Sequence, residues 1–125
     1  MSEPHAVSTA AAPQPAGAYS QAVAVGNLVF TAGFTPKDPA TGTMPDGTAE
    51  QTRQVLRNLA AVLGAEGLTL AHVVKTTVHL ADLGDWAEFD AAYAEFFTDP
   101  LPARTTVGST LAGFRVEIDA VAVRP

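Results

Sequence analysis

Residues 114–123 read FRVEIDAVAV, a stretch in which apolar and more polar side chains alternate almost without interruption. Side chains along a β-strand point alternately to opposite faces of the sheet, so this spacing predicts a strand with one buried face. The face toward the core is predicted to carry Phe114, Val116, Ile118, Ala120 and Ala122, and the opposite face Arg115, Glu117, Asp119 and Val121. Two carboxylates, Glu117 and Asp119, are thereby predicted to share the face that is not in the core.

The rest of the chain supplies further strands and two helices around this strand. Runs rich in β-branched residues predict strands over 19–25, 28–31, 73–81 and 103–110. Capping-box patterns predict helices that begin at Thr48, with Gln51 three residues on, and at Asp85, with Glu88. The predicted apolar stripes are Val55, Leu59, Val62 and Leu63 on the first helix, and Phe89, Ala92, Tyr93, Phe96 and Phe97 on the second. The order ββ-α-β-α-ββ predicts a two-layer α+β domain with helices on one sheet face.

Length and composition limit the classes of function. The chain has 125 residues, no cysteine and a formal net charge of −6, so we expect one domain without thiol or disulfide chemistry. The acidic balance argues against nucleic acid as a partner. Neither a signal peptide nor a run long enough to span a bilayer is evident, so we expect a cytoplasmic protein with no membrane partner. We expect residues 1–16 to be a flexible tail and 17–125 to be the domain.

Three residues are candidates for chemistry, and each also has an ordinary structural interpretation. Arg104 has no carboxylate nearby in the sequence and suits a ligand carboxylate, or it bridges to another strand. Glu117 could act as a base toward water, or it lies on a solvated strand face. Tyr19 could orient a substrate, or it is an ordinary strand aromatic. The three histidines have no metal-ligand spacing, and no phosphate-binding glycine motif is present, so neither a metal nor a nucleotide cofactor is expected.

Several segments together resemble one known family. They are GAYSQA (17–22), TAG (31–33), QTRQVLRNL (51–59), VVKTTVHLADL (73–83), YAEFF (93–97), PARTTV (102–107) and VEIDAVAV (116–123). In this order they resemble the RidA family of reactive intermediate deaminases, also called the YjgF or L-PSP endoribonuclease-like family. The resemblance implies a chorismate-mutase-like fold with a mixed sheet of about five to six strands. It also implies a homotrimer whose sheets form a central barrel, with ligand clefts between subunits.

The resemblance also implies an activity and a set of site residues. The reaction is hydrolysis of 2-aminoacrylate and related enamines or imines to 2-keto acids and ammonia, without a cofactor. Arg104 matches the arginine that holds the substrate carboxylate, Glu117 the glutamate that positions water, and Tyr19 the tyrosine of the cleft. Gly33 and Thr106 match positions whose backbone contacts the ligand.

The chain departs from the common family pattern at three positions. Thr106 stands where many members have cysteine, Ala18 where many have proline, and Phe34 where many have glutamine. Thr106 keeps the backbone N–H, and we expect Phe34 to make the entrance of the cleft more apolar. Two other functions fit the same residues: a non-catalytic protein that binds a 2-keto acid in the same cleft, and, less well, an endoribonuclease. A third alternative is a specialised family member that acts in one biosynthetic or catabolic pathway.

Overall fold

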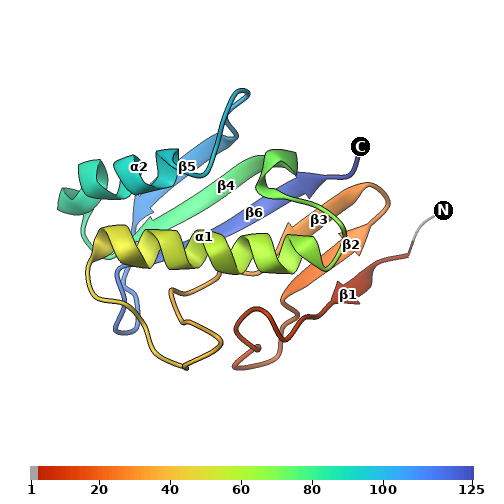
Figure 1. Cartoon of the computed structure of the whole chain (residues 1–125), viewed down its shortest axis with the longest axis horizontal. Helices are drawn as coiled ribbons and strands as arrows, with labels where there is room; N and C mark the ends of the chain where they lie inside the picture. Colours follow the sequence, from red (N-terminus) through yellow and green to blue (C-terminus); the bar gives the residue numbers. More distant parts are fainter. Residues whose placement is uncertain (1–2) are drawn as a thin grey trace.

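The computed structural model describes residues 3–125 and shows two layers, a six-stranded sheet and two α-helices that cover one of its faces (Figure 1). The strands are β1 (His5–Val7), β2 (Ala22–Val25), β3 (Leu28–Thr31), β4 (Val73–Leu80), β5 (Ala103–Gly108) and β6 (Val116–Val123). The α-helices are α1 (Thr48–Gly64) and α2 (Trp86–Ala94), and two short 3₁₀ helices are η1 (Leu70–His72) and η2 (Leu83–Asp85). The predicted two-layer α+β class is confirmed.

The strand order places the last strand near the middle of the sheet. The order is β1-β2-β3-β6-β4-β5, in which every neighbouring pair is antiparallel except β4 and β5. The parallel pair is possible because α2 lies between β4 and β5 in the sequence and forms the crossover. β5 therefore forms one edge of a mixed sheet, and β1 forms the other.

The alternation along β6 is the one predicted from the sequence. Val116, Ile118, Ala120 and Ala122 are buried under the helices, whereas Glu117, Asp119 and Val121 are partly exposed on the other face. Burying a valine or isoleucine side chain contributes about 1.5–3 kcal/mol, so the alternating pattern fixes the register of this strand. The open face of the sheet is thus the face that carries Glu117 and Asp119.

Helix α1 presents the predicted apolar face to the sheet, but it begins differently from the prediction. Val55, Leu59, Val62 and Leu63 are all fully buried. The capping box is absent, because the cap residue is Gly47, with a φ of 86° that favours glycine. The Thr48 hydroxyl instead donates to Asp85 Oδ2 (2.8 Å), and Gln51 Nε2 donates to the carbonyl of Pro45 (3.0 Å). These polar groups tie α1 to the start of α2 and to the preceding loop.

The second capping box is also wrong. Asp85 does precede α2, but its side chain makes no cap hydrogen bond to that helix. The carboxylate accepts hydrogen bonds from Thr48 and from Arg115 Nη1 (3.1 Å) instead. A capping box forms at η1, where Thr69 and His72 bond each other's backbone N–H groups. Tertiary partners therefore outcompete the local caps at both α-helices.

The segment expected to be a flexible tail over 1–16 packs against the sheet in its described part. Residues 5–7 form β1 and pair with β2, and Val7 and Ala12 are 3% and 1% exposed. The buried Gln21 side chain holds this segment, because it accepts from the Thr9 N–H (2.7 Å) and donates to the Pro13 carbonyl (2.9 Å). Because both the oxygen and the nitrogen of this side-chain amide are hydrogen-bonded to the backbone, they fix the path of the Pro-rich segment.

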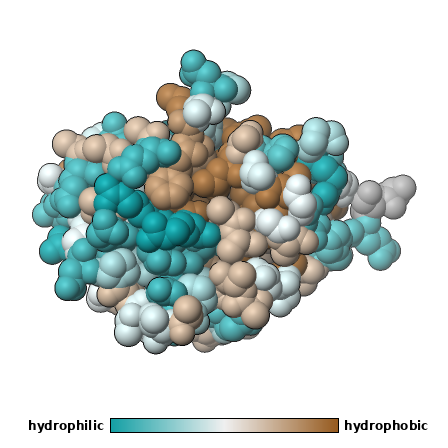
Figure 2. Space-filling model, viewed as in Figure 1, coloured by the Kyte–Doolittle hydropathy of each residue, from teal (hydrophilic) through white to brown (hydrophobic). Residues whose placement is uncertain are grey.

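The outer surface of the helix layer is divided between charged and apolar regions (Figure 2). Hydrophilic side chains gather at the left of the view. Among the charged groups of the helices, Arg53 of α1 pairs with Glu50 one turn earlier and with Glu95, the residue that follows α2. A hydrophobic area lies toward the top, near the loop that follows α2. Among residues 3–125, neither α-helix is long and apolar enough to cross a lipid bilayer.

Candidate functional site

A shallow hollow of about 330 Å³ contains three of the predicted site residues. Its lining is Tyr19, Ala32, Gly33, Thr35 and Glu117. Glu117 comes from the middle of the sheet on β6, and Gly33 from the chain just after β3. Residues nearly a hundred positions apart in the sequence thus converge on one concave surface.

Gly33 and the Glu117 carboxyl group are packed directly against each other. A Cβ atom added to Gly33 would lie 3.0 Å from both Cδ and Oε2 of Glu117. The backbone of the next residue fixes this approach, because the Phe34 N–H donates to the Ile118 carbonyl (2.9 Å) and Phe34 accepts from Ile118 (3.3 Å). Glycine is therefore the residue that lets the carboxylate occupy this place.

Tyr19 lies in the loop before β2 and not in the predicted strand, which begins only at Ala22. The Tyr19 side chain is at the rim of the hollow, and the residue is 52% exposed. Its hydroxyl oxygen accepts a hydrogen bond from the Ala16 N–H (3.0 Å), which holds the ring against its own loop. The phenolic hydrogen is still available to a molecule in the hollow.

Phe34 contributes little surface to the predicted cleft. The residue is only 5% exposed and belongs to the hydrophobic core, although it borders a second, smaller hollow beside Tyr19 and Gly33. Its backbone pairing with Ile118 directs the ring toward the helix layer, on the side opposite Glu117. Within the single chain the ring thus packs mainly in the core, and its role at the entrance of the cleft stays a prediction.

Arg104 lies elsewhere, on the edge strand β5, where it faces helix α2. Its Nη1 donates to Asp90 Oδ1 at 2.7 Å. Its guanidinium carbon lies 4.8 Å from the ring centroid of Tyr93 and 5.3 Å from that of Phe89. The carboxylate that the local sequence lacks is thus supplied by the helix packed over the strand.

Thr106 lies two residues beyond Arg104 and points to the same face. It pairs with the buried Val78 of β4, and its Oγ1 is buried without a hydrogen-bond partner among residues 3–125. A buried hydroxyl is normally satisfied, so this atom is an exception. Arg104 and Thr106 together form a second group of candidate residues, separate from the hollow.

The two groups point to opposite faces of the sheet. Arg104 pairs in register with Thr76, whose hydroxyl is hydrogen-bonded to Tyr93 in the helix layer (2.8 Å). Glu117 lies between two residues that are fully buried against the helices, so its side chain points to the open face. One small ligand therefore cannot contact Arg104 and Glu117 of the same chain.

The open face near Glu117 carries other ionisable groups besides the predicted Asp119. His79 is the cross-strand partner of Glu117, and its Nδ1 lies 2.7 Å from Ser109 Oγ. Burial raises the pKa of Asp119, and the nearby His79 and Lys75 partly oppose this effect. Among residues 3–125, however, no three His, Asp or Glu side chains are grouped in a way that could hold a metal ion.

Sequence reasoning missed the surroundings of Arg104. No local pattern in the sequence places Asp90 or Trp86 beside Arg104. Trp86, Phe89, Asp90 and Tyr93 follow the i, i+3, i+4, i+7 spacing of one helix face, which is the signal that groups them. That spacing does not reveal which strand the face covers, so the pairing with Arg104 needed the structure.

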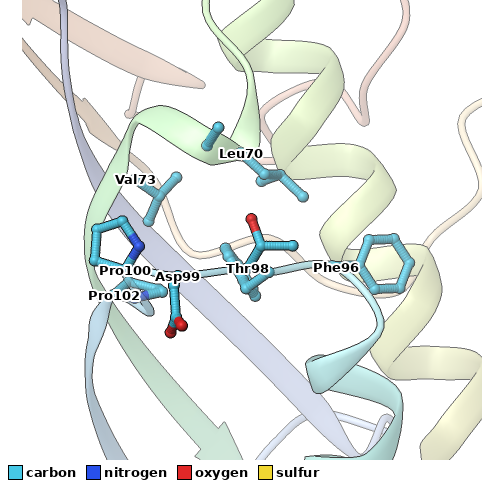
Figure 3. A pocket seen from close by; sticks show the side chains of 9 residues that line it. Leu70, Val73, Phe96, Thr98, Asp99, Pro100 and Pro102 are labelled. Atoms are coloured by element: carbon cyan, nitrogen blue, oxygen red, sulfur yellow. The ribbon is translucent and has the colours of Figure 1, made fainter.

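A separate small cavity lies between η1 and the loop after α2 (Figure 3). It has a volume of about 80 Å³, and its lining includes Leu70, Val73, Phe96 and Pro102. Its only ionisable lining residue is Asp99, and none of the predicted site residues borders it. A carboxylate in the lining does not suit an anionic ligand, so the cavity is not the candidate site.

The fold and these residues define a class of small α+β protein with an acidic hollow on its open sheet face and an arginine at its sheet edge. Comparison with known proteins agrees with this description. The family model described as Endoribonuclease L-PSP matches residues 9–124. The chain therefore belongs to this family, the RidA or YjgF family that its motifs resemble.

Individual relatives cover nearly the whole chain. The RutC family protein y4sK of Sinorhizobium fredii is 48% identical, over 97% of both chains. A 2-iminobutanoate/2-iminopropanoate deaminase of Rattus norvegicus is 42% identical, over 94% of this chain and 88% of its own. The crystal structure of TdcF from E. coli with bound serine superposes with a TM-score of 0.92 at 35% identity, covering 97% of this chain and 99% of that one. Some relatives thus carry an enzyme name, and one was solved with a small amino acid.

Proposed function

We propose that the protein hydrolyses 2-imino acids, or the enamines such as 2-aminoacrylate that form them, to 2-keto acids and ammonia. The observation that carries the proposal is the hollow in which Tyr19, Gly33 and the Glu117 carboxylate meet. Relatives at 41–42% identity that are named 2-iminobutanoate/2-iminopropanoate deaminase support it.

The reaction makes modest demands on the protein, because an iminium carbon is already electrophilic. Arg104 would hold the substrate carboxylate through two parallel N–H···O bonds, each charge-assisted bond contributing about 1.5–3 kcal/mol. Glu117 would place a water about 3 Å from the imine carbon and accept its proton as the C–O bond forms. Glu117 would then return the proton to the nitrogen of the carbinolamine, the C–N bond would break to release ammonia, and the hydroxyl would lose its proton as the C=O bond of the keto acid forms. No step requires a cofactor.

Tyr19 and two backbone groups would complete the site. The phenolic hydrogen of Tyr19 can bond to the substrate or to the attacking water, because its oxygen is already held by Ala16. The backbone at Gly33 lies beside the Glu117 carboxylate, and the Thr106 backbone lies on the strand of Arg104. We expect both backbone segments to contact the ligand.

A complete site requires a second copy of the chain, since Arg104 and Glu117 point to opposite faces of one sheet. We propose a homotrimer in which Arg104 on the edge strand of one copy reaches the hollow of the next. Support comes from the exposed apolar side chains near this edge, among them Leu83, Trp86, Leu101 and Val107. The low content of charged residues, 16%, is also consistent with surface that is buried between copies.

A second candidate function is non-catalytic binding of a small 2-keto or amino acid at the same site. It is favoured by the serine bound in the crystal structure of TdcF. Both functions need Arg104, but only hydrolysis needs a base at Glu117. An endoribonuclease, the activity in the family description, is less consistent with a net charge of −6.

Two variants test the proposal in an assay that generates imines with an amino acid oxidase and measures the keto acid released. We expect Arg104→Ala to abolish hydrolysis without unfolding the protein. We expect Glu117→Gln to retain binding of 2-ketobutyrate in calorimetry but to slow turnover, because an amide cannot accept the proton of water. Full hydrolysis by Arg104→Ala would refute the proposal, and unchanged turnover by Glu117→Gln would favour simple binding.

A further inference from the structure

We infer that Asp90, together with the aromatic face of α2, is a positioning group for Arg104. In this arrangement Asp90 and three rings fix the guanidinium plane, so that one defined N–H edge is presented to the substrate carboxylate. The inference rests on the proposed function, in which Arg104 binds that carboxylate.

The ion pair with Asp90 uses only part of the guanidinium. Nη1 donates to Asp90 Oδ1 at 2.7 Å, while Nε and Nη2 have no hydrogen-bond partner among residues 3–125. Nε and Nη2 form one of the two edges through which an arginine binds a carboxylate with parallel hydrogen bonds. Asp90 therefore leaves a complete bidentate edge for a ligand.

The rings of α2 restrict the plane of the same guanidinium. Its carbon lies 4.8 Å from the Tyr93 ring centroid, 5.3 Å from Phe89 and 5.7 Å from Trp86. Guanidinium groups favour the faces of aromatic rings, so contacts with three rings limit the rotation of a long and otherwise flexible side chain. A surface ion pair alone would not require such surroundings.

The ring that lies nearest to Arg104 is itself held in place. The Tyr93 hydroxyl is hydrogen-bonded to the buried Thr76 hydroxyl at 2.8 Å, and its ring packs on Phe97 with centroids 4.6 Å apart. Burial raises the pKa of Tyr93, so the phenol stays neutral and faces Arg104 as an aromatic surface. A series of contacts thus links the sheet interior to a surface carboxylate, from Thr76 through Tyr93 and Arg104 to Asp90.

The ion pair between Arg53 and Glu95, near the end of α2, provides a matched comparison for the pair between Arg104 and Asp90. Glu95 accepts from Arg53 Nη2 at 2.8 Å, and its side chain is 50% exposed, against 51% for Asp90. Arg53 also pairs with Glu50, and within residues 3–125 its guanidinium does not lie over an aromatic ring. Glu95→Gln therefore removes a similar surface charge without disturbing Arg104.

The experiment compares Asp90→Asn, Asp90→Glu and Glu95→Gln with the unaltered protein. For Asp90→Asn we expect KM for the imine, and Kd for 2-ketobutyrate, to rise about tenfold while kcat stays within about twofold, since a misoriented Arg104 weakens substrate and transition state alike. Asp90→Glu restores a carboxylate and should recover most of the affinity. Glu95→Gln should match the unaltered protein. Circular dichroism and oligomeric size show that each variant is folded.

The outcomes separate this inference from the proposed function. A KM within twofold after Asp90→Asn, tighter binding of 2-ketobutyrate, or an equal change after Glu95→Gln would each overturn the positioning role. If the unaltered protein hydrolyses no imine but binds 2-ketobutyrate, the proposed function fails and calorimetry alone decides the role of Asp90. If the unaltered protein neither hydrolyses an imine nor binds 2-ketobutyrate, Arg104 does not bind a ligand carboxylate, and the positioning role of Asp90 is refuted as well.

Discussion

Replacing Gly33 with alanine tests the candidate site most directly, because the structure gives the size of the disturbance. The new Cβ would lie 3.0 Å from Cδ and Oε2 of Glu117, whereas ordinary van der Waals contacts begin near 3.4 Å. The carboxylate must therefore retreat by at least about 0.4 Å. Since a misplacement of about 1 Å can cost about 100-fold in rate, we expect kcat/KM for the imine to fall about 5- to 30-fold.

The same variant should leave the fold intact. The displaced atoms are the end of a flexible side chain, and Gly33 does not have the positive φ that would strain an alanine. We expect the free energy of unfolding in urea to change by less than about 1 kcal/mol. Loss of activity without loss of stability would then locate the effect at the Glu117 carboxylate.

Gly64→Ala is the matched control, because nothing lies within 4 Å of a Cβ at this last residue of α1. We expect unchanged hydrolysis and a gain in stability of about 0.5–1 kcal/mol, since alanine restricts the unfolded chain more than glycine. The oxidase-coupled release of keto acid, with a nucleophile such as semicarbazide competing for free imine, measures both variants. A folded Gly33→Ala protein with kcat/KM within twofold of the unaltered protein would refute this account of Glu117.

Three further variants test other parts of the structure. Thr106→Val removes the buried hydroxyl that has no hydrogen-bond partner in residues 3–125, so the free energy of unfolding in urea should rise by about 0.5–1.5 kcal/mol. A fall would mean that a second copy of the chain supplies a hydrogen-bond partner for this hydroxyl. Asp119→Asn should stabilise the protein at pH 7, because burial raises the pKa of Asp119 despite the opposing effects of His79 and Lys75. This gain in the free energy of unfolding should disappear as the pH falls toward 3.8, the ordinary pKa of an aspartate, because the protonated acid is uncharged like the amide. Gln21→Ala removes the buried amide that holds the N-terminal segment and should cost about 2–4 kcal/mol, with faster amide exchange confined to residues 7–13; unchanged exchange there would contradict the anchoring role.

The central features of the fold were predictable because each depends on a repeated pattern. The alternation in 114–123 specified which residues of β6 are buried, and the stripe through Val55, Leu59 and Val62 specified the buried face of α1. Both patterns depend on the large free energy of burying apolar side chains, which dominates over local preferences. The class of fold followed from the order of these elements.

Predictions that depended on one or two polar residues fared worse. The caps expected at Thr48 and Asp85 are absent because these two side chains bond each other across the helix layer. The segment before Gln21 is rich in Ala and Pro, and the partners of its backbone come from the buried amide of Gln21, which no local pattern identifies. A side-chain hydrogen bond contributes little net free energy, so a distant partner easily replaces a local one.

In the candidate site, too, one part was predictable from a repeated pattern and the other part was not. Glu117 could be placed on the open face from alternation alone, and the structure brings Gly33 and Tyr19 to it. The position of Arg104 on the opposite face, paired with Asp90, depends on the parallel register of β4 and β5, which joins residues about 30 positions apart. Single-sequence patterns carry no information on such a register, so the separation of the two groups emerged only from the structure.

The opposite orientation of Arg104 and Glu117 has a consequence for the genetics of this protein. If each site draws one residue from each of two copies, a cell that carries an Arg104 allele and a Glu117 allele, each inactive alone, assembles mixed rings. About one site in four then combines the intact arginine of one copy with the intact glutamate of its neighbour. Two loss-of-function alleles of one gene would therefore complement each other in part, a behaviour that a site contained within one chain would not allow.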